Sequence, residues 1–385
     1  MGHISATVVL GAICLVIWLY LCFLHGRFWR IRVERGSPPA LLRRVVAVVP
    51  ARNEADVVAS AIRSLLTQIG VDISVILVDD HSTDSTASIA GQAARDLSAE
   101  DRITVISAPP LPEGWTGKLW AVQQGIDLAQ QSAPDFILLT DADIEHSPDN
   151  VASLVAKAEI GNCDLTSYMV KLACSTAPER LLIPAFVYFF FQLYPPAWIR
   201  NPSSPIAGAA GGCMLVRPEA LHRSGAMHSL RSEIIDDCAL AQRVKKSGGS
   251  VWLGPTDSAH SIRPYESFGE IERMIARSAF NQLRHSTALL FFAIIGLLLT
   301  YLAPVALLFT SAWPLGLAAS ALMLITYRPM VRFYRLNPLW ALTLPVAASF
   351  YLAATVHSAV RYWIGRGGEW KGRAQDQKST GATHA

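Results

Sequence analysis

The chain has 385 residues, of which 51% are hydrophobic and only 16% are charged, and its formal net charge is +3 at pH 7. Soluble proteins average about 25% charged residues, so an ordinary soluble enzyme without apolar segments is excluded, and the length allows two domains or one domain with additions. No cluster of Lys and Arg interleaved with aromatic residues is present, which argues against nucleic acid as a partner.

The apolar residues are concentrated near the two ends of the chain. Four segments are apolar and close to the roughly 20 residues that a bilayer requires: residues 7–24, 288–310, 311–327 and 339–360. We therefore predict an N-terminal transmembrane anchor over residues 1–26 and a C-terminal transmembrane region over residues 288–360. A polar tail over residues 366–385 is predicted to be disordered.

Basic residues predict how the first segment is oriented. It has no Lys or Arg before it and no A-x-A cleavage site after it, so a signal peptide is disfavoured. Four arginines follow it, at Arg27, Arg30, Arg32 and Arg35, and the positive-inside rule keeps them in the cytoplasm. The six cysteines form no C-x-x-C pair, which agrees with a reducing compartment. We predict an uncleaved anchor with its N-terminus outside and a cytoplasmic middle domain.

The topology of the last segment stays open at this stage. A span over residues 288–310 exits and one over residues 311–327 returns, which places Arg328 inside. A complete further span would then leave Arg361 outside, against the rule. Either residues 339–360, interrupted by Pro345, are not a simple span, or the tail is an exception.

Strand-like and helix-like patterns alternate over residues 43–284. The short apolar run Val45–Val49, which Pro50 ends, is typical of a strand buried on both faces. The elements predicted after it are a helix over 55–68, a strand over 74–78, a helix over 84–97, a strand over 103–106, a helix over 117–130 and a strand over 136–140. This alternation predicts βαβ units and a doubly wound, mostly parallel sheet. Neither G-x-G-x-x-G nor a P-loop is present.

Acidic residues stand where two of these strands end. Asp79-Asp80 closes the second strand, and Asp141-Ala142-Asp143 follows the buried run Phe136–Thr140. Ligands of α/β sheets bind outside the carboxyl ends of the strands, and paired carboxylates suit a hard divalent cation and the diphosphate that it carries. A third acidic pair, Asp236-Asp237, comes later.

The motifs Val48–Glu54, Val78–Asp84 and Thr140–Asp143, in this order and spacing, resemble the nucleotide-sugar half of the family 2 inverting glycosyltransferases, which have the GT-A fold. The resemblance covers about residues 45–284. Gly114–Ala121 and Pro255–Tyr265, together with the terminal apolar segments, are similar to the hopene-associated glycosyltransferase group of bacteria. That resemblance implies the inner membrane of a bacterial cell, with several spans.

The resemblance implies roles for the acids at the strand ends. Asp80 is expected to bind the uracil or ribose, with Glu54 and the Pro50-Ala51 backbone beside it. Asp143 is the better candidate for a ligand of Mg²⁺ or Mn²⁺, and Asp141 is expected to reach the ribose or the metal. The structural alternatives are a helix cap for Asp80, a solvated acid for Glu54 and two surface carboxylates for the D-x-D pair.

Asp237 is the candidate catalytic base. Asp236-Asp237-Cys238-Ala239-Leu240 with Arg243 looks like the family's E-D-x-x-L-x-x-R helix start, with Asp236 where Glu is usual. A carboxylate there can remove the proton of an acceptor hydroxyl while its oxygen attacks the anomeric carbon. The alternative is a pair of acids at a helix N-terminus, where the macrodipole favours them.

Other residues carry weaker expectations. Lys118 is expected to approach the diphosphate, although an exposed lysine at a helix start explains it as well. At Met274–Ser278 the Q-x-x-R-W of processive synthases is not matched, and only Arg277 remains as a diphosphate contact. His260, after the predicted strand Val251–Leu253, is a metal-ligand candidate or a packed histidine. The turn Gly208–Gly212 leads to an acceptor-side strand or is simply structural.

Residues 181–200 are aromatic, uncharged up to Arg200 and interrupted by prolines. An interfacial segment fits them better than a span, because they lie between motifs that must share one side; a buried core helix is the alternative. The whole sequence predicts a membrane-bound glycosyltransferase that moves a sugar from a nucleotide donor, UDP-linked, to a lipid hydroxyl such as that of a hopanoid. A polyprenyl-phosphate glycosyltransferase and a non-catalytic membrane scaffold are the alternatives, and oligomeric state stays open.

Overall fold

The structure is a computed structural model of the chain that describes residues 5–34, 41–231, 233, 235–364, 369–370 and 373–374. Its residues group into two compact units. The sheet unit comprises Arg32–Leu172, Ile199–Arg263 and Gly367–Ala385, and the helical unit comprises Met1–Ile31, Ala173–Trp198 and Pro264–Arg366. The tail predicted over residues 366–385 lies outside the described residues, apart from the short strands β9 (Glu369–Trp370) and β10 (Arg373–Ala374).

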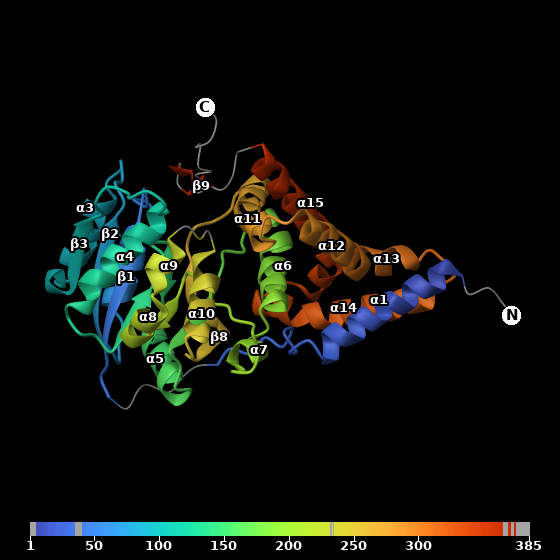
Figure 1. Ribbon diagram of the computed structural model, residues 1–385, viewed down its shortest axis with the longest axis horizontal. Coiled ribbons are helices and arrows are strands. Elements are labelled where there is room, and N and C mark those ends of the chain that lie inside the picture. Colours follow the sequence, from blue (N-terminus) through green and yellow to red (C-terminus); the bar gives the residue numbers. More distant parts are fainter. Residues whose placement is uncertain are drawn as a thin grey trace, which may run out of the picture. The chain divides into compact units, whose positions relative to one another are not determined.

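An eight-stranded sheet forms the centre of the sheet unit (Figure 1), in the order β3-β2-β1-β4-β7-β6-β8-β5. The strands are β1 Arg44–Ala51, β2 Asp72–Asp79, β3 Ile103–Ser107, β4 Phe136–Leu139, β5 Ile144–His146, β6 Leu165–Lys171, β7 Met214–Val216 and β8 Val251–Ser261. Strands β3, β2, β1 and β4 run parallel, as do β6 and β8, whereas β7 and β5 pair antiparallel with their neighbours. This mostly parallel sheet confirms the predicted α/β fold class.

Helices cover both faces of the sheet because the strands alternate between two apolar faces. The helices of this unit are α2 Val58–Leu66, α3 Thr86–Arg95, the 3₁₀ turn Glu100–Arg102, α4 Gly117–Gln130, α5 Asn150–Ile160, α8 Pro218–Ser224, α9 Ala226–Leu230 and α10 Asp236–Lys246. On one face Val45, Ala47 and Val49 pack with α2, α3 and α5 in a single core cluster. On the other face a side chain at Gly125 of α4 would overlap Val48, so α4 lies directly against β1.

The prediction that Pro50 ends the first strand was wrong. β1 continues through Pro50 to Ala51, with Pro50 opposite Val78 of β2. Because the Ala51 carbonyl accepts from the Asp80 N–H at 2.8 Å, alternation turns the Pro50 nitrogen away from β2. It faces β4, whose pairing with β1 ends at Val48. The missing N–H of proline therefore removes no ladder hydrogen bond.

The described elements of the helical unit are helices and helical turns. They are α1 Ala6–Phe23, α6 Ala177–Leu193, α11 Phe268–Gln282, α12 Thr287–Leu297, a π-helical turn Leu298–Leu302, α13 Ala303–Leu307, α14 Trp313–Phe333, a 3₁₀ turn Pro338–Thr343 and α15 Leu344–Trp363; α7 Pro196–Arg200 begins in this unit and ends in the sheet unit. Helix α1 lies along α14, and α11 along α15 (Figure 1). Pro345 falls in the first turn of α15, where a proline is tolerated, so it does not interrupt that helix.

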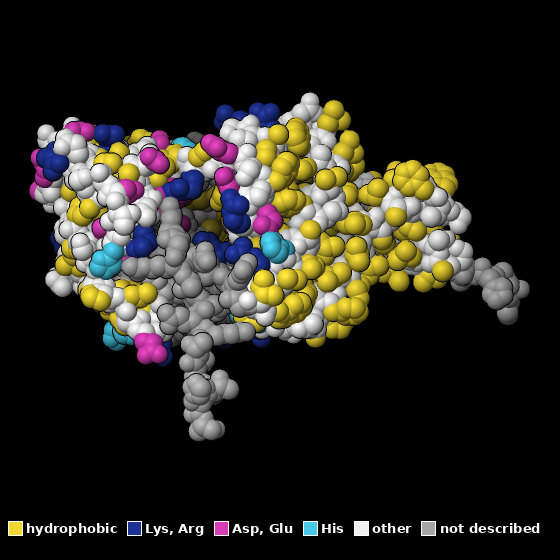
Figure 2. Space-filling view, turned by 90° about the horizontal axis from the view of Figure 1, so that it is seen from above, with side chains coloured by type: hydrophobic (Ala, Val, Ile, Leu, Met, Phe, Trp, Pro, Cys, Tyr) yellow, Lys and Arg dark blue, Asp and Glu magenta, His cyan; other side chains and the backbone are white. Residues whose placement is uncertain are grey.

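Five helical stretches of the described chain are long and apolar enough to cross a membrane: Ala6–Phe23, Ala177–Arg200, Thr287–Leu307, Trp313–Phe333 and Pro338–Trp363. Hydrophobic side chains gather over the surface of the helical unit (Figure 2), and Phe291, Phe292 and Phe309 are 59%, 66% and 87% exposed. A surface of this kind is unfavourable in water and suits lipid. The four apolar segments predicted at the two ends of the chain correspond to four of these helices.

Helix α6 covers most of the segment predicted to be interfacial. A capping box of Thr176 and Glu179 starts it, and Pro184 lies inside it. Within the helical unit it packs against α14 and α15. The Tyr188 hydroxyl lies 2.8 Å from Thr326 Oγ1, and the Tyr351 hydroxyl donates to the Leu182 carbonyl. One face of α6 is therefore buried among helices, as the core-helix alternative requires, while its depth in a bilayer stays a prediction.

Candidate active site

The carboxyl ends of β1, β2 and β4 lie side by side because these three strands are parallel neighbours. Each is followed by an acid that the sequence singled out: Glu54 after β1, Asp80 after β2, and Asp141 with Asp143 after β4. The parallel register therefore gathers carboxylates from three separate motifs at one edge of the sheet, which is where ligands of such sheets bind.

Asp80 is nearly inaccessible, with 1% of its surface exposed. The Arg52 guanidinium lies 3.6 Å from its carboxylate and also donates to the Asp80 carbonyl. The adjacent acids have local partners instead, since Asp79 accepts from Ser82 and Asp84 accepts from the Thr86 and Ala55 N–H groups. Although burial opposes the shift, the hydrogen bonds from Thr86 and Ala55 lower the pKa of Asp84. These contacts fix the turn after β2 and leave Asp80 paired with a cation.

Arg263 connects two of the predicted site acids. It follows β8, forms an ion pair with Glu54, and its Nε lies 3.6 Å from the Asp143 carboxylate. The Ser261 hydroxyl also donates to Asp143, at 3.2 Å. Burial and the nearby charge of Asp141 raise the pKa of Asp143. The cation therefore spans from the motif after β1 to the D-x-D motif after β4.

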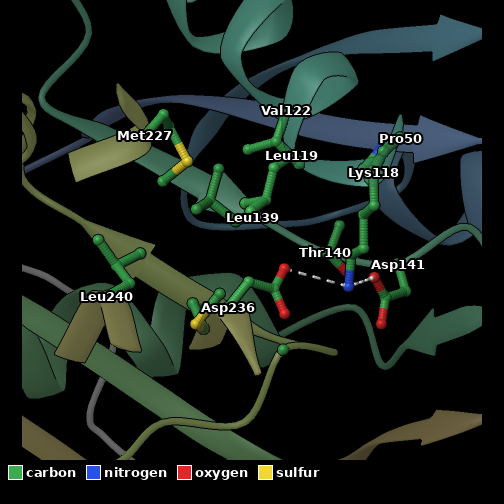
Figure 3. Close-up of a pocket in the computed structure, with 12 residues that line it drawn as sticks. Pro50, Lys118, Leu119, Val122, Leu139, Thr140, Asp141, Met227, Asp236 and Leu240 are labelled. Atoms are coloured by element: carbon green, nitrogen blue, oxygen red, sulfur yellow. Dashed lines mark ion pairs between the residues drawn. The ribbon is translucent and has the colours of Figure 1, made fainter. Parts of the chain in front are cut away.

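Lys118 connects the D-x-D motif with the later acidic pair. Thr116 caps the N-terminus of α4 and Gly117 opens it, which places Lys118 in the first turn. Its Nζ lies 2.9 Å from Asp141 and 3.6 Å from Asp236 (Figure 3). Burial opposes the charge on Lys118, but the two carboxylates outweigh it and raise the lysine pKa above its ordinary value. The ammonium therefore stays charged and holds α4, the end of β4 and the start of α10 together.

The carboxylate of Asp237 is held by backbone donors. The Gly211 N–H donates to one of its oxygens at 2.9 Å, and the Cys238 N–H donates to the other at 2.7 Å. Burial and the charge of Asp236 raise the pKa of Asp237 to about 6, although these two hydrogen bonds and Lys118 act in the opposite direction. A carboxylate of this kind is oriented, ionised near neutral pH and able to accept a proton.

A buried hydrogen-bond chain lies behind the Gly211-Gly212 turn. The Thr140 hydroxyl donates to the Gly212 carbonyl at 2.8 Å, so it accepts from His146 Nε2, which is 3.1 Å away. His146 Nδ1 accepts from Asn150, which in turn accepts from Ser258. Burial lowers the pKa of His146 to about 3, so its ring stays neutral. This chain connects the residue before the D-x-D motif to the turn that holds Asp237.

A pocket with about 340 Å³ of empty space, its open mouth included, lies next to the Lys118 bridge. Its polar lining consists of Lys118, Thr140, Asp141, Gly211 and Asp236. Its apolar lining consists of Pro50, Leu119, Val122, Leu139, Met214, Met227 and Leu240 (Figure 3). Figure 3 shows Leu119, Val122, Leu139 and Met227 together on one side of the bridge, whereas Pro50 lies beside Lys118, so apolar side chains line more than one side of the pocket.

Two further residues carried weaker expectations. His260 is in β8 itself, which extends well beyond the predicted Val251–Leu253, and its register partner is Glu145 of β5. It is therefore not in a loop after the strand, as the sequence suggested; its neighbour Ser261 is the one bonded to Asp143. Arg277 lies exposed on α11 in the helical unit, and its contact with a diphosphate stays a prediction.

The D-x-D carboxylates fit a divalent cation. Among the described residues no three His, Cys, Asp or Glu side chains form a metal-binding group. Mg²⁺, however, is commonly bound by one or two carboxylates, with substrate phosphates and water completing its shell. Asp141 and Asp143 are close enough for the charge of one to raise the pKa of the other, and each already faces a cationic side chain. Carboxylate oxygens are hard ligands of the kind that such an ion prefers.

Sequence reasoning missed the contacts that join these motifs. In the sequence, Arg263 stands out only as part of the stretch Pro255–Tyr265, and Thr140 only as the last residue of a predicted strand. Their side chains meet partners that are 209 and 72 residues away. The Gly208–Gly212 stretch was a usable signal, because a flexible turn was noticed there, but its N–H donation to Asp237 depends on the fold.

Comparison with solved structures gives the fold. The mannosyltransferase PcManGT from Pyrobaculum calidifontis, solved in complex with GDP-Man and Mn²⁺, matches with a TM-score of 0.53 and 18% identity, over 91% of this chain and 98% of that one. The fold is thus that of the GT-A glycosyltransferases. Residues 46–225 match the family model described as Glycosyl transferase family 2. This part of the chain is therefore similar to the family 2 glycosyltransferases.

Curated relatives match over about a third of the chain. The undecaprenyl-phosphate 4-deoxy-4-formamido-L-arabinose transferase of Enterobacter sp. (strain 638) is 30% identical over 123 residues, which are 31% of this chain and 35% of that protein. The protein of the same name from Pseudomonas fluorescens (strain Pf0-1) is 27% identical over 126 residues, 32% of this chain and 34% of that protein. The chain thus matches about a third of the length of these relatives.

Proposed function

We propose that the protein is a membrane-bound inverting glycosyltransferase that transfers a sugar from a nucleotide-sugar donor to a lipid acceptor. One arrangement carries the proposal: Lys118 joins the D-x-D acid Asp141 to Asp236, and the next residue, Asp237, is oriented by two backbone N–H groups. A cation site for a diphosphate and a proton acceptor for the attacking group are therefore held close together.

The donor half is assigned from the strand ends. Asp80 and Glu54, with the Ala51 backbone beside them, are proposed to bind the nucleoside, for which a UDP-linked donor is the specific proposal. Asp141 and Lys118 are proposed to face the diphosphate. Bound by Asp143 and Asp141, Mg²⁺ or Mn²⁺ would neutralise the charge that develops on the departing nucleoside diphosphate. Glu54 and Asp143 now face Arg263, so donor binding requires Arg263 to change partners.

Asp237 is proposed as the general base. The acceptor oxygen attacks the anomeric carbon, the bond to the nucleoside diphosphate breaks, and Asp237 takes the acceptor proton. A single displacement inverts the anomeric configuration. The pKa of Asp237, raised to about 6 by burial and by Asp236, suits a base that is ionised at neutral pH but still basic enough to assist.

The apolar helices support a lipid as the acceptor, because they would keep the domain at a membrane surface. A lipid hydroxyl, such as that of a hopanoid, is the specific proposal. A polyprenyl phosphate is the second candidate, favoured by the curated relatives, which are named undecaprenyl-phosphate sugar transferases. A phosphate acceptor needs no general base, so the two candidates predict different roles for Asp237.

Nucleotide binding tests the donor half. Detergent-solubilised protein titrated with UDP, GDP and CDP should bind UDP in the presence of Mn²⁺ and lose that binding with EDTA or in Asp143→Ala. Binding of GDP or CDP instead of UDP would change the nucleobase assigned to the donor, but the protein would still be proposed as a glycosyltransferase. The absence of binding to every nucleotide would reject the proposal and favour a non-catalytic membrane scaffold.

Replacement of the base separates the two acceptors. We expect Asp237→Asn to bind the donor nucleotide like the parent protein and to lose transfer to a hydroxyl by about 10²–10⁴-fold, the usual contribution of a general base. Transfer should be measured with a sterol-like or hopanoid alcohol and with a polyprenyl phosphate. Transfer to the phosphate that survives in Asp237→Asn would establish the second candidate.

A further inference from the structure

Contacts inside the helical unit determine which helix ends share a side of a membrane. Helix α1 lies along α14, and the two begin at the same end, where the Thr7 hydroxyl lies 3.3 Å from that of Ser311. The stretch from α12 to α13 runs the opposite way and ends beside the start of α14, where Leu307 lies against Gly316. If these three stretches cross the membrane, as their length and composition allow, the start of α12 and the end of α14 lie on one side of it.

Helix α15 begins and ends on that same side. The 3₁₀ turn Pro338–Thr343, which leads into it, closely follows the end of α14 and packs against it. At the other end of α15, Ala359 and Tyr362 form an apolar cluster with Leu290 in the first turn of α12. A single crossing would place the two ends of α15 on opposite sides. Although α15 is long and apolar enough to span, these contacts therefore disfavour a span.

A charged helix lies along the C-terminal half of α15. Helix α11 follows it in the same direction, through contacts of Phe268 with Phe350, Glu272 with His357, Ala276 with Ser358 and Phe280 with Tyr362. In Figure 1 the two helices run across the direction of α1 and α14. Helix α11 also carries Arg273 and Arg277, both exposed. Charged side chains are unfavourable at the centre of a bilayer, so this half of α15 belongs at the level of the headgroups.

The exposed face of α15 is apolar along its whole length. Leu342, in the turn before the helix, and Val346, Val356, Val360 and Trp363 are all exposed. Their spacing follows the helical repeat and places them on one face. An apolar stripe on one face, beside a neighbouring helix that carries the charges, suits a surface that lies in the plane of a membrane and inserts its apolar side chains among the lipids.

We propose that α15 lies in the plane of one leaflet, on the side where α14 ends, and binds the lipids of that leaflet through this exposed stripe. The chain then crosses the membrane three times, through α1, α12–α13 and α14. Three crossings put Arg361 on the same side as the arginines that follow α1, as the positive-inside rule requires, whereas a fourth would separate them. Arg273 and Arg277 of α11 face anionic headgroups of the same leaflet. This placement holds whether or not the protein transfers a sugar.

Labelling from the two sides of the membrane tests the number of crossings. Ser311, before α14, and Ile364, after α15, are both exposed. With only α14 crossing between them, Ser311→Cys and Ile364→Cys lie on opposite sides. An impermeant maleimide should therefore label one of them in intact spheroplasts and the other only after lysis, whichever way the protein is oriented. The unsubstituted protein measures labelling of the native cysteines. Equal labelling of both variants in intact spheroplasts, or equal protection, would mean that α15 spans and would overturn the proposal.

The depth of the exposed stripe distinguishes a helix in the plane from one that passes through the core. Nitroxide labels on Val346→Cys, Ala353→Cys and Val360→Cys, all at exposed positions, should be compared in reconstituted bilayers by their accessibility to oxygen and to a water-soluble nickel chelate. We expect the three labels at the same depth. A spanning α15 would place the middle label about 10 Å deeper than the others, because seven helical residues rise by about that distance, and this result would overturn the proposal.

Helix α1 supplies the matched control. Val9, Val16 and Phe23 are exposed and have the same spacing as the three positions on α15. Because α1 is expected to span, the label on Val16→Cys should lie deepest, by about 10 Å. The proposal requires this gradient in α1 together with its absence in α15; the same gradient in both helices would make α15 a fourth span.

Discussion

Asp236 and Asp237 are adjacent in sequence, but their side chains have different partners. Asp236 faces the Lys118 ammonium, whereas Asp237 accepts two backbone N–H groups. Asp236 is thus part of an ion-pair bridge, and burial together with the charge of Asp236 raises the pKa of Asp237. Environments that separate the roles of neighbouring carboxylates are typical of acid–base sites.

The raised pKa predicts the acidic limb of the pH profile. Because Asp237 must be ionised to accept a proton, kcat/KM for transfer to a hydroxyl should rise about tenfold per pH unit below pH 6 and level off above it, since burial and Asp236 place its pKa at about 6. Initial rates between pH 4.5 and 8 measure this limb. A rate independent of pH over this range would contradict the role of Asp237 as the base.

The same shift predicts how stability depends on pH. Folded Asp237 binds its proton more tightly than the unfolded chain, with a pKa of about 6 against 3.8. Its stabilising contribution is therefore present below the unfolded pKa and is lost as the pH rises through about 6. Asp237→Asn removes this loss, so we expect its Tm to exceed that of the parent protein at pH 7.5 and to approach it at pH 4. Asp101→Asn, at an exposed position, is the control and should show no such trend.

Lys118 provides a third prediction at the residue scale. Lys118→Met removes the ammonium proposed to bind the diphosphate, so UDP affinity should fall about 10- to 100-fold, as for the loss of a hydrogen bond to a charged group. Lys118→Arg keeps the charge and should retain part of the affinity. Lys157→Met, which removes a lysine paired with Glu34 elsewhere in the sheet unit, should bind UDP normally. Normal binding by Lys118→Met would leave Lys118 a purely structural bridge.

Among the secondary-structure elements, the short strand β4 positions several parts of the candidate active site. It ends at Leu139, and the next residue, Thr140, makes the hydrogen bond to the Gly212 carbonyl. The neutral His146 ring behind Thr140 can only donate to that hydroxyl, because its other nitrogen accepts from Asn150. The position of the turn that orients Asp237 therefore depends on the end of β4.

Thr140→Val tests this dependence. The variant leaves the Gly212 carbonyl and the His146 N–H without a partner, which costs about 1–3 kcal/mol for a buried polar group. If the turn loosens, the Gly211 N–H bond to Asp237 weakens, the base loses a contact that favours its charged form, and the acidic limb moves to higher pH.

We expect kcat to fall in Thr140→Val with little change in the donor KM, and Thr140→Ser to restore the parent profile. Ser153→Ala removes another buried hydroxyl, one bonded to Tyr168, and should reduce stability without moving the pH limb. If the acidic limb of the pH profile does not move in Thr140→Val, Thr140 contributes to folding and not to the orientation of Asp237.

Local pattern explains which elements were predictable from sequence. The helix predicted over residues 117–130 coincides with α4, because Thr116 caps it and its apolar spacing is helical. The strands around Val45, Val75 and Phe136 were found because each is a buried apolar run. The helix predicted from residue 55 begins at Val58 instead, since the Glu54 and Ala55 N–H groups bond to Thr86 and Asp84 in another motif.

The features that were not predictable from local pattern depend on contacts between residues far apart in the sequence. β8 was predicted too short because Gly254 and Pro255 interrupt its strand-like pattern, yet β6 and β5 both pair with it. The motif acids could be named because the resemblance marks them individually. The ion pairs that Lys118 and Arg263 form with these acids could not be predicted. Each cation pairs with an acid that is more than a hundred residues away in sequence, at the end of a different element.

For the whole molecule, chain connectivity limits how α6 meets a membrane. The chain enters the helical unit at Ala173 and re-enters the sheet unit at Ile199. If the sheet unit stays on one side of a bilayer, both ends of the segment containing α6 must be on that side. A single crossing would separate them, so connectivity favours the predicted interfacial placement although α6 is long and apolar enough to span.

The helical unit also predicts which loops share a side of the membrane. The Thr7 hydroxyl, at the start of α1, lies 3.3 Å from that of Ser311, in the turn between α13 and α14. With the arginines after α1 in the cytoplasm, both would be on the outer side of a bacterial inner membrane, and the sheet unit would be cytoplasmic.

An impermeant maleimide applied to spheroplasts should then label Ser311→Cys, which is exposed, but should reach Ser203→Cys of the sheet unit only after lysis. The unsubstituted protein measures labelling of the native cysteines. Labelling of Ser203→Cys in intact spheroplasts, with Ser311→Cys protected, would reverse the orientation and place the candidate active site outside the cytoplasm.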